Sequence, residues 1–197
     1  MREKGQIHAI EGIFAAIVLI LSLVFALQVS AVTPMTESTS SQHIENQQKA
    51  VGQDLLQAGS ENDSLKPVLT YWDLEQERYH DPDTDGIATA DLRTELEFGS
   101  ELATTLTDRG IAFNLHVNYL EDGTIYSRTV VNQGEPSDHA VTATTMVTLY
   151  ESDRFYDSDG SPTETTLAEG EDDFYIPNEG SGPVYNVAEM ELVIWRM

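Results

Sequence analysis

An unbroken apolar run near the N-terminus constrains this chain more than any other feature of its sequence. Residues 12–27 read GIFAAIVLILSLVFAL, with Ser22 as the one polar side chain, and the apolar character continues less regularly to Val32. About 20 helical residues, each rising 1.5 Å, cross the ~30 Å hydrocarbon core of a bilayer, and Ile13 to Val32 has that length. The run therefore predicts one transmembrane helix, with residues 1–33 acting as leader and anchor.

The charges on either side of this run predict its direction in the membrane. Arg2 and Lys4 precede it, whereas the charged residues that follow it are predominantly acidic. The positive-inside bias then keeps the N-terminus in the cytoplasm and exports the C-terminal domain to the extracellular side. A secretory signal peptide, cut near Ala26 or Ala31, is the alternative interpretation, although its apolar core is usually shorter.

The net charge excludes several classes of partner for the exported part. The chain has 34 acidic and 10 basic residues and a formal net charge of -24, and residues 1–32 contribute none of this charge. Such a field repels nucleic acid and anionic lipid, so we expect no nucleic-acid partner. The chain has no cysteine, which excludes disulfides and thiol chemistry. Few lysines among many carboxylates resemble the proteins of halophilic archaea, where salt screens the mutual repulsion.

The residues just before the apolar run carry a processing motif. Lys4, Gly5 and Gln6 lie on its predicted cytoplasmic side, and Glu11 lies at the membrane edge. This N-terminus resembles the class III signal peptide of archaeal type IV pilin-like proteins. The resemblance implies that a prepilin peptidase cuts after Gly5 and that the apolar helix remains as anchor and filament core. It also implies other pilin-like subunits and the pilus assembly machinery as partners.

Glu11 has two interpretations. In bacterial-type pilins a glutamate stands fifth in the mature chain, whereas Glu11 is sixth when counted from Gln6. A carboxylate at the start of a membrane helix gains from the helix dipole and, in a filament, from the free amine of a neighbouring subunit. The resemblance thus implies an assembly role for Glu11; a simple interfacial anchor is the alternative.

The rest of the chain predicts an α+β fold with an antiparallel sheet and at least one covering helix. We expect Thr33-Pro34 to break or kink the anchor helix. Residues 34–60 then continue it as a stalk, because Ile44, Val51 and Leu55 have helical spacing. Residues 61–197 form the exported acidic domain. Its predicted elements are a strand or loop at 67–74, a helix at 89–108 that Gly110 ends, and strands at 111–120, 125–131, 140–150 and 184–195, the first two joined by a hairpin turn at 121–124. Residues 152–182 are expected to form an acidic surface excursion with a short strand near 174–176.

One acidic loop has half of a calcium-binding pattern. Asp81, Asp83 and Asp85 precede Gly86, as in the first half of an EF-hand loop, but Leu92 occupies the position of the bidentate glutamate. The sequence therefore predicts at most a weak Ca²⁺ site and otherwise a solvated acidic loop. Residues 157–160 (DSDG) are a weaker version of the same pattern. No other cofactor is expected.

The remaining motifs favour a non-catalytic protein. Asn62-Asp63-Ser64 is the one N-glycosylation triplet in the chain, and an exported domain would expose Asn62 to modification. No nucleophile motif, phosphate loop or histidine pair at zinc spacing is present, so we expect no enzyme.

These features predict a minor pilin or pseudopilin-like structural subunit, assembled through its N-terminal helix. Residues 111–131 and the C-terminal YNVAEMELVIWRM extend the resemblance to small haloarchaeal pilin-like membrane proteins of unassigned function. The alternative is an uncleaved, membrane-tethered extracellular binding module that binds calcium.

Overall fold

The structure is a computed structural model that describes the backbone of residues 2–80 and 95–196. Side chains are described for residues 12–25, 42–80 and 95–196. The chain divides into two compact units, Met1–Ile44 and Glu45–Met197. The predicted stalk, residues 34–60, is therefore shared between the two units, and each unit is described by itself below.

Helix α1 (Arg2–Glu61) provides all of the described backbone of the first unit. The helix continues through Pro34, so of the predicted break or kink, a break does not occur there. Proline removes one hydrogen bond and crowds the preceding turn, at a cost of about 3 kcal/mol. The remaining turns of this 60-residue helix keep their backbone hydrogen bonds, so a single proline does not end the helix.

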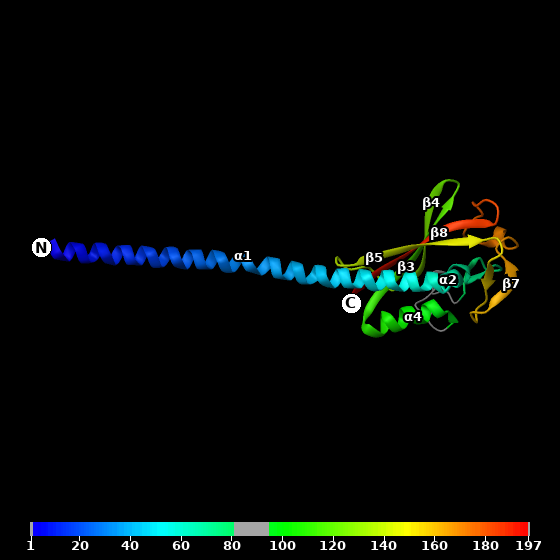
Figure 1. The fold of residues 1–197 in the computed structure, drawn as a ribbon, viewed down its shortest axis with the longest axis horizontal. Coiled ribbons are helices and arrows are strands. Elements are labelled where there is room, and N and C mark those ends of the chain that lie inside the picture. Colours follow the sequence, from blue (N-terminus) through cyan, green and yellow to red (C-terminus); the bar gives the residue numbers. More distant parts are fainter. Residues whose placement is uncertain (1, 81–94, 197) are drawn as a thin grey trace. The chain divides into compact units, whose positions relative to one another are not determined.

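A four-stranded antiparallel sheet organises the second unit and confirms the predicted α+β class. Its strand order is β4-β3-β8-β5, and Figure 1 shows the strands side by side. All four strands lie within two residues of their predicted positions. They are β3 (Ile111–Glu121), β4 (Thr124–Asn132), β5 (Val141–Tyr150) and β8 (Val184–Arg196).

The β3–β4 hairpin forms where the sequence predicted it. Asp122 and Gly123 have φ values of 50° and 75°, the positive values that a tight two-residue turn between right-twisted strands requires. Tyr119 pairs with Tyr126 across the hairpin, and Leu120 pairs with Ile125. The turn thereby sets the register of the two strands.

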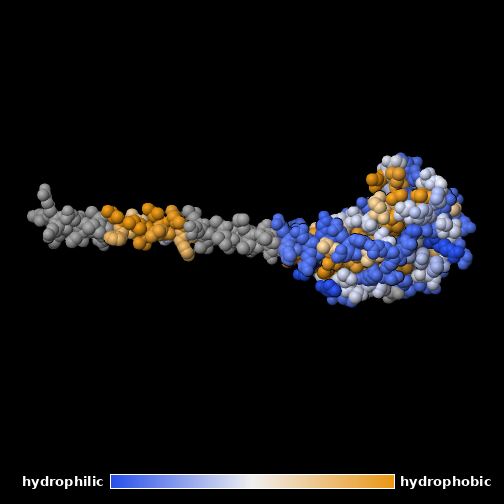
Figure 2. Space-filling model, in the orientation of Figure 1, coloured by the Kyte–Doolittle hydropathy of each residue, from blue (hydrophilic) through white to orange (hydrophobic). Residues whose placement is uncertain are grey.

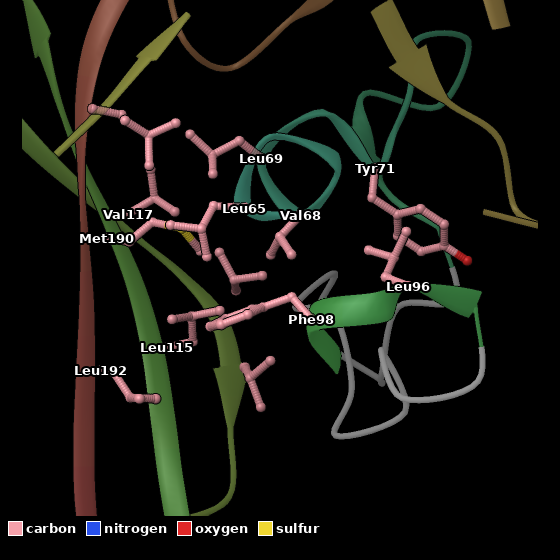
Figure 3. Close-up of a cluster of buried hydrophobic side chains, with 14 of the residues drawn as sticks. Leu65, Val68, Leu69, Tyr71, Leu96, Phe98, Leu115, Val117, Met190 and Leu192 are labelled. Atoms are coloured by element: carbon pink, nitrogen blue, oxygen red, sulfur yellow. The ribbon is translucent and has the colours of Figure 1, made fainter. Parts of the chain in front are cut away.

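One face of the sheet is covered by helices. Helix α2 (Leu65–Thr70) and helix α4 (Glu97–Thr105) contribute Leu65, Leu69 and Phe98 to the core. Figure 3 shows these side chains directed toward residues of β3 and β8. The C-terminal part of α1 covers the same core, with Leu56 at 1 % exposure. The predicted covering helix is thus present, together with α1 and α2.

Two local predictions need correction. Residues 67–70 are the end of helix α2 and not a strand, because Pro67 lies in the first turn, where its missing N–H costs little. The chain becomes extended only at β1 (Trp72–Asp73), which pairs with β2 (Arg78–Tyr79). The predicted helix at 89–108 is shorter in the described part of the chain, because Leu96 is extended and α4 begins at Glu97; a short 3₁₀ turn, Thr107–Arg109, follows α4. Gly110, at φ 70°, ends this helical region as expected.

The acidic segment 152–182 is not the surface excursion that its composition suggested. It forms the hairpin β6 (Arg154–Tyr156) and β7 (Pro162–Thr166) and the 3₁₀ turn Glu171–Asp173. No strand forms at residues 174–176. Four apolar side chains from this segment belong to the hydrophobic core, and the acidic residues between them hide the pattern; they are Phe155, Leu167, Phe174 and Ile176.

Candidate functional site

The apolar segment of α1, residues 12–25, is the candidate site for anchoring or assembly. Its large apolar side chains, including Phe14, Leu19 and Phe25, are 44–69 % exposed, and Figure 2 shows them as a continuous hydrophobic band. Successive helical residues are about 100° apart, so five consecutive exposed residues from Ile17 to Leu21 cover every side of the helix. Such a segment has no polar face to leave in water.

Over the residues whose side chains the structure describes, no helical window is both long and apolar enough to cross a membrane. The predicted span extends to Val32, and the side chains of residues 26–32 lie outside the described part.

The predicted processing and assembly residues belong to the same helix. Lys4, Gly5, Gln6 and Glu11 lie within the backbone range of α1, and their side chains are outside the described part of the chain. Gly12, one residue after Glu11, is described, and a Cβ added there meets no atom within 4 Å. This position therefore accepts a larger side chain without a clash.

The predicted calcium loop lies outside the described residues. Asp81, Asp83 and Asp85 all fall in the range 81–94. Among the residues that the structure does describe, no three histidine or acidic side chains are grouped as metal ligands.

The weaker calcium pattern at residues 157–160 is a β-turn in the structure. Asp157 accepts the Ser158 N–H at 2.7 Å, and Asp159 accepts the Ser161 N–H at 2.9 Å. These bonds and the positive φ of Gly160 close the β6–β7 hairpin. The spacing of the aspartates is therefore explained by turn formation.

The predicted glycosylation site lies in the turn between α1 and α2. Asn62 is exposed, and its Oδ1 accepts a hydrogen bond from the Ser64 N–H at 3.0 Å. Ser64 itself is only 5 % exposed. The first residue of the triplet is thus accessible in the folded domain, whereas the third is not.

An aromatic cluster that the sequence did not predict joins three distant segments. Trp72, Tyr79 and Tyr175 surround the guanidinium of Arg128, which lies 4.5 Å from the Trp72 ring centroid and 4.9 Å from that of Tyr175. The Tyr79 hydroxyl donates to the Tyr175 hydroxyl at 2.6 Å, and the latter donates to the Leu69 carbonyl oxygen at 3.2 Å. No local spacing connects these residues, so only the register of the strands and loops brings them together.

The tyrosines of this cluster serve packing and not acid–base chemistry. Burial raises the pKa of the Tyr79 hydroxyl far above its usual value, and the nearby Tyr175 and Arg128 offset only part of this shift. Burial also raises the pKa of Tyr175. Both hydroxyls remain neutral donors at physiological pH.

Two grooves separate the C-terminal part of α1 from the edge strand β5. The larger is about 530 Å³ and is lined by residues that include Gln53, Gln57 and Thr144. The smaller, about 340 Å³, is lined by residues that include Asp63, Lys66 and Tyr150. Ser60 lines both grooves.

Comparison with known proteins identifies the family of the chain. Residues 4–194 match the family of unknown function DUF7288, and the chain therefore belongs to this family. No curated protein and no solved structure matches the chain significantly.

Proposed function

We propose that this protein is a structural subunit of a surface assembly, anchored and assembled through the apolar segment of α1. In this role it is a minor pilin or pseudopilin-like subunit of an archaeal type IV pilus-like system. The observation that carries the proposal is the exposure of apolar side chains on every side of α1 over residues 12–25. Water does not stabilise such a helix, and lipid or the helices of neighbouring subunits do.

The buried tyrosines and the aspartates at 157–160 of the second unit support a structural role, because their hydrogen bonds stabilise the fold. The buried tyrosines are neutral and hydrogen-bonded to one another or to backbone oxygens, as in Tyr185, whose hydroxyl donates to the Ile176 carbonyl oxygen at 2.9 Å. The aspartates at 157–160 close a turn.

The N-terminal sequence and intact mass of the protein, recovered from native membranes and sheared surface filaments, test the proposal. We expect a chain that begins at Gln6 or Ile7 and retains the apolar helix. A chain that begins at Met1 would favour the uncleaved, tethered binding module. A chain that begins after Ala31 would be a secreted soluble domain and would contradict both roles.

A pair of glycine substitutions makes this test specific. Gly5→Val removes the residue before the expected cut and should leave the full-length chain. Gly12→Val makes the same chemical change seven positions later, where an added Cβ meets no atom within 4 Å. We expect normal processing of Gly12→Val; equal processing of the two variants would contradict cleavage by a prepilin peptidase.

A further inference from the structure

Asn62 has the accessibility of an attachment site for a modifying group. It directly follows the last residue of α1, Glu61, and its side chain is exposed. Its Oδ1 accepts a hydrogen bond from the Ser64 N–H at 3.0 Å. Its Nδ2 has no hydrogen-bond partner among the described residues. The oxygen therefore orients the amide, while the nitrogen, the atom that a sugar would join, is free.

The two sequence neighbours of Asn62 line the two grooves between α1 and β5. Glu61, the residue before Asn62, lines the larger groove, and Asp63, the residue after it, lines the smaller one. A group attached to Asn62 therefore starts one residue away from the lining of each groove. The smaller groove, of about 340 Å³, has enough space for a sugar ring.

The lining of the smaller groove suits a carbohydrate. The Tyr150 ring is 39 % exposed, and the Lys66 ammonium lies 5.0 Å from its centroid. Met146 adds a second exposed apolar surface, while Ser60 and Asp63 add hydrogen-bonding groups. Sugars have C–H faces that pack on aromatic and apolar side chains and hydroxyl groups that bind polar ones, so this mixture matches both parts.

We propose that Asn62 carries an N-linked glycan and that the smaller groove holds the sugars nearest to the attachment point. In the transfer, a bond forms between Asn62 Nδ2 and C1 of the first sugar, and Nδ2 loses a proton. The bond between C1 and a phosphate oxygen of a lipid-linked oligosaccharide donor breaks, and the lipid phosphate leaves with that electron pair. The inference rests on the proposed function in one respect, because the domain must be exported.

The burial of Ser64 places the modification before folding. A glycosylation triplet is recognised through the hydroxyl of its third residue, and Ser64 is only 5 % exposed. Its Oγ is buried without a hydrogen-bond partner in the described structure. The transferase reaches Ser64 only while the turn and helix α2 are still unfolded, so the folded, unmodified protein is not a substrate.

Mass spectrometry of the full-length protein from its native membranes tests the attachment. We expect wild-type protein to carry added mass in sugar-sized increments on the peptide that contains Asn62. Asn62→Gln should carry none. Ser64→Ala is the matched control: it removes the recognition hydroxyl without breaking a recorded hydrogen bond, so this variant should fold normally and lack the glycan, whereas Ser64→Thr should keep it.

Protease accessibility in intact cells separates the two ways in which this inference can fail. An unmodified wild-type chain whose domain is digested from outside would overturn the glycan and leave the proposed function in place. An unmodified chain whose domain is protected inside the cell would overturn both.

Thermal unfolding tests the groove. For a glycosylated chain, the midpoint should exceed that of the same chain with Ser64→Ala. Tyr150→Ala should reduce this difference to about half or less, because it removes the ring that packs on the sugar. Tyr126→Ala removes another exposed tyrosine that does not line the groove and should leave the difference unchanged. An equal effect of the two variants would overturn the role of the groove.

Discussion

Two stretches of helix α1 use apolar residues in opposite ways. In residues 12–25 the large apolar side chains are exposed on every side. In residues 45–61 the apolar side chains form one stripe, in which Leu55 and Leu56 are buried and Val51 packs against the core. The glycines differ in the same way, since a Cβ on Gly12 meets nothing, whereas a Cβ on Gly52 would lie 2.7 Å from Ile194 Cδ1.

This comparison teaches that the arrangement of apolar residues, more than their number, decides what a helix packs against. A stripe about 100° wide matches a single surface and docks onto a sheet. An apolar surface on all sides needs an apolar environment on all sides, which the folded domain of one chain does not supply. The following predictions test this difference, beginning with the largest expected effect.

Phe98→Ala should destabilise the second unit strongly and leave the anchor unaffected. Phe98 is fully buried at 0 % exposure, and loss of a buried phenylalanine ring costs about 3–5 kcal/mol. Denaturant unfolding of the full chain in detergent should show this loss, while membrane fractionation should be unchanged. Release of the variant from the membrane would contradict the independence of the two stretches.

Leu23→Arg should weaken membrane association and leave the stability of the second unit unchanged, the reverse of Phe98→Ala. Leu23 is 62 % exposed, so the substitution breaks no packing within the chain. An arginine near the centre of a membrane helix costs about 2.5–3.5 kcal/mol on insertion scales. We expect the variant to leave the membrane fraction with unchanged unfolding of the domain, and Leu23→Ala to stay in the membrane. Full retention of Leu23→Arg would contradict the anchoring role.

Gly52→Val should destabilise the domain by about 1–3 kcal/mol, because extra atoms in a packed contact force neighbouring side chains to move. The nearest atoms are Ile194 Cδ1 and Ala143 Cβ, at 2.7 and 3.1 Å from the added Cβ. Gly12→Val, in the other stretch, should leave the free energy of unfolding unchanged. Similar unfolding midpoints for the two variants would show that residues 45–61 do not pack closely on the sheet.

Alkaline pH should destabilise the second unit, with a slope for Tyr79 that approaches about 1.4 kcal/mol per pH unit above pH 10. Burial raises the pKa of Tyr79 in the folded state above its usual value of 10.0. Above about pH 10 the unfolded chain loses this proton while the folded chain keeps it, so stability present at lower pH is lost as pH rises. Chemical unfolding between pH 9 and 11 should show this slope, and Tyr79→Phe should reduce it. An unchanged slope in Tyr79→Phe would assign the alkaline loss to other groups.

Local pattern predicted the sheet well and the acidic segment poorly. Residues 111–131 alternate around an Asp122-Gly123 turn, so strand position and pairing follow from neighbouring residues. Residues 152–182 supply their core side chains singly, and Phe155 and Phe174 stand among acidic residues. No periodicity marks them, because each side chain is buried by a loop path and not by a repeating element.

The candidate sites also divide into those that consecutive residues define and those that residues far apart in the chain form. The sequence located the apolar segment of α1 and the turn at Asn62, because each is defined by consecutive residues. It did not indicate the groove beside Asn62 or the contact of Arg128 with Trp72 and Tyr175, whose residues come from distant parts of the chain.

The sequence alone thus determined the positions of the four strands of the main sheet and the stretch of α1 that is apolar on all sides. These properties depend on local conformational preference and on the period of apolar residues. The tertiary structure decided the strand order β4-β3-β8-β5, the burial of side chains from the acidic segment and the grooves next to Asn62. These features arise from contacts between residues far apart in the chain, whose free energy depends on how whole surfaces fit together.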